Sequence, residues 1–419
     1  MIRPLMINFA DNQGGAAKAC LRLYRALRQR GVGVSMVVSR KRSSLEGVLG
    51  PGNIWGRFRA LAGPTLERLV FQHRLINRKG MFSVNALPDN LPQALKAAPE
   101  HNLIHLHWIN GAFVRIETLS RFRGPVVWTL HDLWPFSGGC HYPGECTRYT
   151  GQCGRCPMLG SRFMDDLSAK TWRRKSRAWQ GLNLVLIAPS RWIGNEARKS
   201  SLFKEKRIEV IPNGVDLARF RPREKEALRK NLNLSGRKKL ILTTHADDDR
   251  GDRKGIGILA EALRKLKNSG YGTDVELVVV GTGSLDSPQR FGVKTVCAGR
   301  IHGESSMAEY YAAVDLFVAP SREDNLPNTV LEAMACGTPC VAFNVGGLPD
   351  MVEHEKNGYL ARPFDPGDLA KGIASIFADE KFRGMLSIYA RRKAEMEFGI
   401  ETCADRHISL YEDLVDGVG

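Results

Sequence analysis

The chain has 419 residues, 43% of them hydrophobic and 25% charged, which is enough for two globular domains with a core in each. No run of eighteen apolar residues occurs, so no membrane-spanning helix is expected. The formal net charge of +17 favours anionic partners, but no recognised DNA- or RNA-binding motif is present, and we expect no nucleic-acid partner.

The first half predicts strands alternating with helices. Its N-terminus lacks the long apolar stretch of a signal peptide and predicts a strand over 5–9, so we expect a cytoplasmic protein. A helix over 16–29 follows, because its apolar residues recur on one face. Further strands are predicted over 34–38, 103–107, 126–130, 184–188 and 208–211, and helices over 165–180 and 191–200. This alternation indicates a parallel sheet covered on both faces.

A loop with two glycines, Gly14 and Gly15, lies between the first strand and the first helix. Glycines allow the backbone to approach a ligand closely, and the helix that follows offers N–H groups. The alternative interpretation is a tight turn. No full GxGxxG pattern occurs here, which disfavours a dinucleotide enzyme.

Segment 53–80 mixes tryptophan, phenylalanine and leucine with several arginines. Basic amphipathic stretches of this kind suit a membrane surface rich in anionic lipid. A plain packed pair of helices explains the same pattern. The sequence leaves both interpretations open.

A histidine, His131, follows the strand predicted over 126–130. At a strand end it could hydrogen-bond a substrate hydroxyl or move a proton. The alternative is a structural histidine held by the neighbouring Asp132. Two further histidines, His105 and His107, share the strand predicted over 103–107 and could line a site or lie in the core.

The glycine-rich loop 138–158 holds a cluster of four cysteines in the pattern C-x5-C-x6-C-x2-C: Cys140, Cys146, Cys153 and Cys156. Four thiolates suit tetrahedral Zn²⁺, and a metal would order a loop with few core residues. We therefore expect a structural zinc. An iron–sulfur cluster, two disulfides or free thiols are the alternatives.

The second half repeats the strand–helix pattern after a charged, proline-punctuated segment. Strands are predicted over 239–244, 276–280, 295–298, 316–319 and 339–343, and helices over 367–378, 380–397 and 401–415. The predicted domains are 1–215 and 216–395, and the closing segment 396–419 could pack back on the first domain.

Two carboxylates, Asp324 and Glu332, follow the strand predicted over 316–319. A helix beginning near Pro327 would turn its first amides toward the strand end, where they form an anion site suited to a diphosphate. Glu332 could reach the hydroxyls of a ribose. The alternative is a capped helix with an incidental glutamate. The other candidate contacts in this stretch are Asn325, Leu326, Asn328 and Thr329.

The stretch SREDNLPNTVLEAMACGTPCVAF resembles the signature of the retaining glycosyltransferases of family four. Other segments match that family in order: APSRW, IPNGVDLARF, DRKGIGILAEAL, VGTG and VGGLPDMV. Two positions depart from it, because Asp324 stands where glutamate is common and Asn325 where glycine is common. The resemblance implies the GT-B fold: two Rossmann-like, doubly wound parallel-sheet domains that face a central cleft.

The resemblance also implies a set of binding residues. Lys254 would pair with the donor diphosphate, and Arg250 or Arg253 would replace an arginine that the family carries nearby. Glu332 would hold the donor ribose while the loop 324–329 wraps the sugar and diphosphate. The loop with Gly14 and Gly15 would face the donor or acceptor, and His131 would lie near the reacting sugar.

The implied activity is transfer of a sugar from a UDP- or GDP-linked donor to a glycan or lipid-linked acceptor, in cell-surface polysaccharide biosynthesis. The enzyme would then work in the cytoplasm, peripheral to the inner face of the membrane through segment 53–80. The alternatives are a transferase for soluble acceptors and a non-catalytic binding protein. No Asp-x-Asp motif stands in the expected place, so no catalytic metal is expected.

Overall fold

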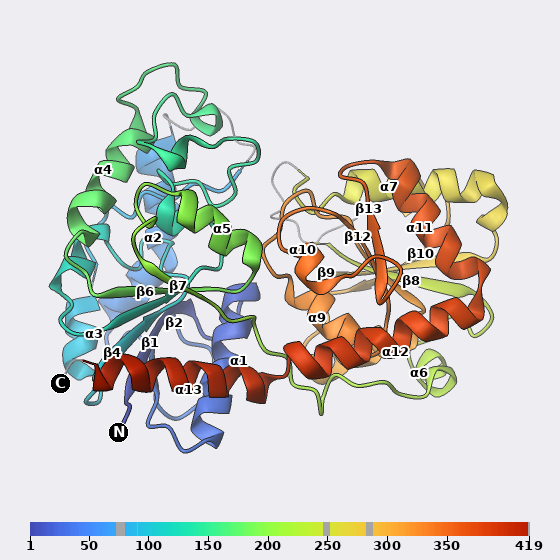
Figure 1. Ribbon diagram of the computed structural model, residues 1–419, viewed down its shortest axis with the longest axis horizontal. Helices are drawn as coiled ribbons and strands as arrows, with labels where there is room; N and C mark the ends of the chain where they lie inside the picture. The colour runs from blue at the N-terminus through green and yellow to red at the C-terminus, as the bar shows by residue number, and fades with distance from the viewer. Residues whose placement is uncertain (73–79, 90, 246–251, 282–287, 418–419) are drawn as a thin grey trace. The chain divides into compact units, whose positions relative to one another are not determined.

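The computed structural model describes residues 1–72, 80–89, 91–245, 252–281 and 288–417, and it divides into two compact units (Figure 1). Unit 1 comprises Met1–Gly214 and Glu401–Gly419. Unit 2 comprises Val215–Ile400. The chain therefore passes from unit 1 to unit 2 once and returns for its last helix.

Unit 1 is built on a seven-stranded parallel sheet in the order β3-β2-β1-β4-β5-β6-β7. Its strands are β1 (Pro4–Ala10), β2 (Ser35–Arg40), β3 (Val48–Leu49), β4 (Leu103–Leu106), β5 (Val126–Thr129), β6 (Leu184–Ala188) and β7 (Arg207–Val210). The helices are α1 (Gly15–Gln29), α2 (Ile54–Gln72), α3 (Leu91–Ala97), α4 (Leu167–Trp179), α5 (Arg191–Lys199) and α13 (Ile400–Asp416).

Unit 2 is built on a six-stranded parallel sheet in the order β10-β9-β8-β11-β12-β13. Its strands are β8 (Lys239–His245), β9 (Val275–Gly281), β10 (Lys294–Gly299), β11 (Leu316–Ala319), β12 (Cys340–Phe343) and β13 (Gly358–Ala361). The helices are α6 (Lys225–Asn231), α7 (Ile256–Leu266), α8 (Glu304–Ala313), α9 (Asn328–Ala335), α10 (Leu348–Met351), α11 (Pro366–Ala378) and α12 (Glu380–Glu397).

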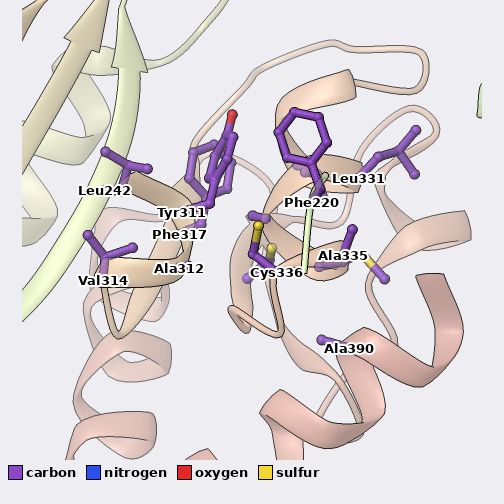
Figure 2. Packing of buried hydrophobic residues seen from close by; sticks show 14 of the residues in the cluster. Phe220, Leu242, Tyr311, Ala312, Val314, Phe317, Leu331, Ala335, Cys336 and Ala390 are labelled. Carbon is purple, nitrogen blue, oxygen red and sulfur yellow. The ribbon is translucent and has the colours of Figure 1, made fainter. Parts of the chain in front are cut away.

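Both faces of the unit 2 sheet are covered by apolar cores, as the alternation of side chains along a strand requires. Leu240 and Leu242 of β8 point into one core, and Ile241 between them points into the other. Figure 2 shows part of the first core, which contains both Tyr311 of α8 and Leu331 of α9. The second core contains the buried side chains of α7 and α11.

The strand order reverses direction once in each sheet. In unit 1 the reversal lies between β1 and β4, and in unit 2 it lies between β8 and β11. At such a reversal, the loops that follow the two neighbouring strands run in opposite directions. A crevice forms between them at the carboxyl ends of the strands, and ligands bind there. The predicted fold class, two Rossmann-like parallel-sheet domains, is confirmed.

Most predicted elements agree with the structure to within two residues at each end. No range was predicted from the sequence for β3, β13, α3, α6, α7, α8 and α10. α13 packs on unit 1, where Arg30 and Arg207 pair with its aspartates Asp405 and Asp413. Within the described ranges, no helix has both the length and the apolar character needed to cross a bilayer.

Candidate functional site

An ion pair joins the two loops at the strand-order reversal of unit 2. Lys254 follows β8, and Asp324 follows β11. The ammonium nitrogen of Lys254 lies 2.5 Å from Oδ2 of Asp324, and a guanidinium nitrogen of Arg253 lies 3.8 Å from the same oxygen. Asp324 is only 6% exposed, yet two cations face it. The reversal point is thus a polar, positively charged corner of unit 2.

The electrostatics of this corner keep Asp324 ionised. Burial by itself would raise the pKa of its carboxyl group, because a charged form is disfavoured away from water. The Lys254 ammonium and Arg253 guanidinium outweigh this effect, and a hydrogen bond from the Asn325 amide adds to theirs, so the pKa lies below its usual value. Asp324 therefore acts as a fixed counterion that holds both basic side chains in place.

Two glycines allow the loops to approach this closely. Gly255, directly after Lys254, has φ +68°, and a Cβ there would lie 1.8 Å from the carbonyl oxygen of Pro320. Gly346 has φ +55°, and a Cβ there would lie 2.1 Å from the carbonyl oxygen of Asp324. Both clashes are with backbone atoms, so neither position accepts a side chain without moving the loop.

Helix α9 begins beside Asp324 with an uncapped N-terminus. Its N-cap residue is Pro327, no side chain caps this end, and its first turn contains no acidic residue. Since the first amides of a helix lack intrahelical acceptors and carry the positive end of the dipole, this end suits an anion. Asn328 and Thr329 open the helix, and Glu332, one turn in, is 1% exposed. The structure therefore gathers Lys254, Arg253 and Asp324 at the loop that leads into α9.

Part of the predicted site lies outside the described residues. Arg250 falls in the segment 246–251, and the last two residues of the VGTG stretch fall in 282–287. Arg253, the other arginine predicted to replace the family's arginine, lies within the described residues. Its guanidinium also donates a hydrogen bond of 2.9 Å to the carbonyl oxygen of Glu323.

The glycine loop of unit 1 also forms an uncapped helix N-terminus. Gly14 is the N-cap residue of α1, with φ +92°, and Gly15 is the first residue of the helix. No side chain caps this end, and no acidic residue lies in the first turn. This loop follows β1, so it lies at the strand-order reversal of unit 1, as the loop with Lys254 does in unit 2.

His131 is half-buried after β5 and is held by another histidine. Its Nε2 lies 3.0 Å from Nδ1 of His107, and the two rings stack. The neighbouring Asp132 carboxylate accepts hydrogen bonds from the Trp108 indole and the Trp134 amide, and it shares a 2.7 Å hydrogen bond with the His141 ring. Burial lowers the pKa of His131 to about 4, so its imidazole is neutral near pH 7.

The row of histidines extends into the core and ends on α13. The ring of His105 lies 4.2 Å from that of His107, and its Nδ1 shares a 2.6 Å hydrogen bond with the hydroxyl of Tyr411. Its other nitrogen shares a 2.8 Å hydrogen bond with Thr129. The sequence could not reveal the contact between His105 and Tyr411, because 306 positions separate the two residues.

The cysteine loop lies between β5 and α4, and none of its four cysteines, all of them in the described ranges, forms a disulfide. Burial raises the pKa of Cys153 to about 11 and that of Cys156 above its usual value, and the neighbouring cysteines add to this. Across the described ranges, no group of three or more His, Cys, Asp or Glu side chains is placed so that it could hold a metal ion. Lys175 of α4 holds the start of the loop in place, because its amino group donates hydrogen bonds to the carbonyl oxygens of Trp134 and Ser137.

Two family models match the chain. The model of Glycosyltransferase Family 4 matches residues 13–219, and the model of glycosyl transferases group 1 matches residues 238–379. An uncharacterised glycosyltransferase of Methanocaldococcus jannaschii is 25% identical over 338 residues, which cover 75% of this chain and 84% of that protein. The matched ranges contain the loops and helix ends described above.

Solved structures with similar folds include two that span almost the whole chain. Sucrose-phosphate synthase from Thermosynechococcus elongatus has a TM-score of 0.70 at 20% identity and covers 100% of both chains. The Anabaena protein HepE, solved in complex with UDP and glucose, has a TM-score of 0.65 at 17% identity and covers 99% of this chain and 100% of its own. At these identities, the likeness establishes the fold.

Replacing Lys254 by methionine should destabilise unit 2 in a way that depends on pH. The substitution leaves the buried Asp324 carboxylate with the more distant Arg253 as its one cationic partner among the described residues, so we expect a loss of about 1–3 kcal/mol near neutral pH. Because the pKa of Asp324 is lowered in the wild type, its contribution to stability is present above the ordinary pKa and is lost as the pH falls through the folded value. Thermal unfolding followed by circular dichroism should show the difference between variant and wild type shrinking toward acid pH. An equal difference at every pH would contradict this account of the ion pair.

The zinc prediction is tested by metal analysis of the purified chain. The four thiols would have to rearrange around a metal ion, so a chain that holds one zinc, lost in Cys156→Ser, would bear out the prediction made from the sequence. Cys297→Ser is the matched control, since Cys297 is an exposed cysteine on β10. A metal-free protein with four titratable thiols in this loop would refute the zinc site, and a visible absorbance band would indicate an iron–sulfur cluster instead.

Proposed function

Because this chain belongs to glycosyltransferase family 4, we propose that it transfers a sugar, with retention of anomeric configuration, from a nucleoside-diphosphate sugar to a glycan or lipid-linked acceptor. The main support is the corner formed by Lys254, Arg253 and Asp324 next to the N-terminus of α9. Its position at a strand-order reversal is where parallel sheets bind ligands. HepE, which shares the fold, was solved with UDP and glucose, and this supports a UDP-linked donor.

In this proposal, unit 2 binds the donor through its diphosphate and ribose. Lys254 supplies a positive charge to the diphosphate, and the first amides of α9 supply oriented N–H groups. These groups would stabilise the negative charge that develops on the leaving diphosphate as the bond to the sugar breaks. Glu332 would accept hydrogen bonds from the vicinal hydroxyls of the ribose. Asp324 keeps Lys254 extended toward this position.

The loops of unit 1 would contact the sugar and acceptor. We assign His131 a hydrogen bond to a sugar hydroxyl, because it is half-buried at a strand end and is neutral near pH 7. The uncapped N-terminus of α1 at Gly14 would bind a second polar or anionic group of the substrates. We assign no carboxylate nucleophile.

The charge of the chain supports the proposed acceptor and pathway. The formal net charge of +17, with arginines gathered along α2, supports an acceptor linked to anionic lipid. We therefore propose that the enzyme works in the cytoplasm, at the inner face of the membrane, in cell-surface polysaccharide biosynthesis. The competing candidates are a soluble acceptor, as the name of sucrose-phosphate synthase implies for that protein, and a non-catalytic binding protein.

The donor assignment is tested by turnover of a panel of nucleotide sugars, with and without EDTA. We expect the wild type to turn over one of the nucleotide sugars at the same rate with EDTA as without it. The Glu332→Gln variant should lose roughly 10–100-fold in kcat/KM, since a hydrogen bond to a charged group is worth about 1.5–3 kcal/mol. Glu261→Gln, an exposed position on α7, is the control for loss of a carboxylate. A Glu332→Gln variant that keeps full turnover and melting temperature would refute the ribose contact.

The panel also separates the competing functions. Turnover only with a soluble sugar acceptor would replace the lipid-linked acceptor in the proposal. Binding of nucleotide sugars without turnover, under every acceptor tried, would favour the non-catalytic protein.

The neutral state of His131 leads to a prediction about pH. Since burial lowers its pKa to about 4, no ionisation of this side chain should appear in the activity between about pH 5.5 and pH 8. The His131→Asn variant should therefore lose kcat/KM by a constant factor, about tenfold, across that range. A factor that grows through the ordinary histidine pKa, with both proteins still folded, would show that the protonated ring takes part.

A further inference from the structure

Helix α2 presents its apolar side chains to solvent and its small and acidic side chains to the protein. Trp55 is 75% exposed and Leu61 is 67% exposed. The face toward unit 1 consists of Ala60, Gly63 and Glu67, which are all buried. An ordinary surface helix has the opposite arrangement, with its apolar stripe against the core. Residues 73–79 of the predicted segment 53–80 lie outside the described residues, and in the described part of α2 these apolar side chains are exposed.

Polar contacts hold α2 in this orientation. The buried carboxylate of Glu67 accepts a hydrogen bond from the backbone amide of Asn85. Pro64 has no N–H with which to satisfy the carbonyl oxygen of Ala60 four residues earlier, and the guanidinium of Arg40 donates to that oxygen at 2.9 Å instead. The helix is thus fixed from its inner side, which leaves the outer side available to a partner.

The exposed apolar residues form one continuous face bordered by arginines. At about 100° per residue, six of them fall within an arc of roughly 140°. The six are Ile54, Trp55, Phe58, Leu61, Leu66 and Leu69. The exposed Arg57 and Arg68 lie along one border of this arc, and the exposed Arg59 lies along the other. We call these nine residues the α2 face.

We propose that the α2 face docks on a bilayer that contains anionic lipid, with its apolar residues entering the interface and its arginines contacting the lipid phosphates. Helices with one apolar face and basic borders lie in the plane of a membrane interface in this way. The net charge of +17 adds long-range attraction to an anionic surface. A second copy of the chain fits this face poorly, because docking two such faces would bring like-charged arginine borders together.

The proposal deepens the proposed function by naming the surface on which the acceptor is met, and it rests on that function only for this purpose. Membrane binding and sugar transfer are separate measurements. A chain that binds vesicles but turns over no donor would leave the α2 face standing and the proposed function refuted. A chain that turns over a soluble donor but does not bind vesicles would refute the docking of the α2 face and leave sugar transfer standing.

Co-sedimentation of the full chain with lipid vesicles tests the proposal. We expect the wild type to bind vesicles that contain phosphatidylglycerol, to bind pure phosphatidylcholine vesicles much less, and to dissociate as salt is raised. Removing one arginine with Arg57→Gln should lower the partition coefficient about fivefold. The triple variant Trp55→Ser, Phe58→Ser, Leu61→Ser should lower it at least tenfold.

Two controls keep the result interpretable. The triple variant changes only exposed side chains, so its melting temperature and its turnover of a soluble donor should match those of the wild type. Ile388→Ser with Met396→Ser removes two other exposed apolar side chains, 69% and 67% exposed on α12, and should leave vesicle binding unchanged. Failure of the wild type to bind, or equal binding by the triple variant, would overturn the proposal. Self-association that the triple variant abolishes, without vesicle binding, would assign the face to a second copy instead.

Discussion

The ion pair between Lys254 and Asp324 is the interaction on which the candidate site of unit 2 depends. A parallel sheet directs the loops of neighbouring strands apart only where the strand order reverses, and this pair spans that point. Asp324 is buried and would be costly there as an unpaired charge, so the structure requires the basic side chains beside it. The same arrangement places a positive charge next to the amino end of α9. One pair of residues therefore meets a structural requirement and, in the proposed function, would also bind the donor diphosphate.

Unit 1 organises its corresponding corner with histidines. Its strand-end region is lined by histidines whose pKa values burial lowers, so the row from His105 to His131 is neutral and is held by ring contacts and shared hydrogen bonds. The far end of the row is Tyr411 on α13, the helix that returns to unit 1 after unit 2 is complete. A row of contacts thus connects the half-buried His131 to a helix close to the end of the chain.

Helix α2 shows how an amphipathic pattern can be satisfied in two opposite ways. The spacing of apolar residues fixes which side chains share a face, but it does not say whether that face meets the core or the solvent. Here, the carboxylate of Glu67 and the guanidinium of Arg40 make the inner side polar. A hydrophobic face turned outward must be covered by something other than the fold of its own unit.

The sequence by itself determined the local structure and the family. The alternation of apolar strands with helices predicted the parallel sheets and most of their strands. The stretch around Asp324 and Glu332 predicted the loops that carry the candidate site. Both predictions succeed because these features depend on neighbours along the chain. The tertiary structure alone decided which side chains meet. Lys254 pairs with Asp324, and His105 contacts Tyr411, although each pair lies far apart in sequence. The outward orientation of α2 likewise depends on residues distant from it along the chain. Periodicity carries no information about such partners.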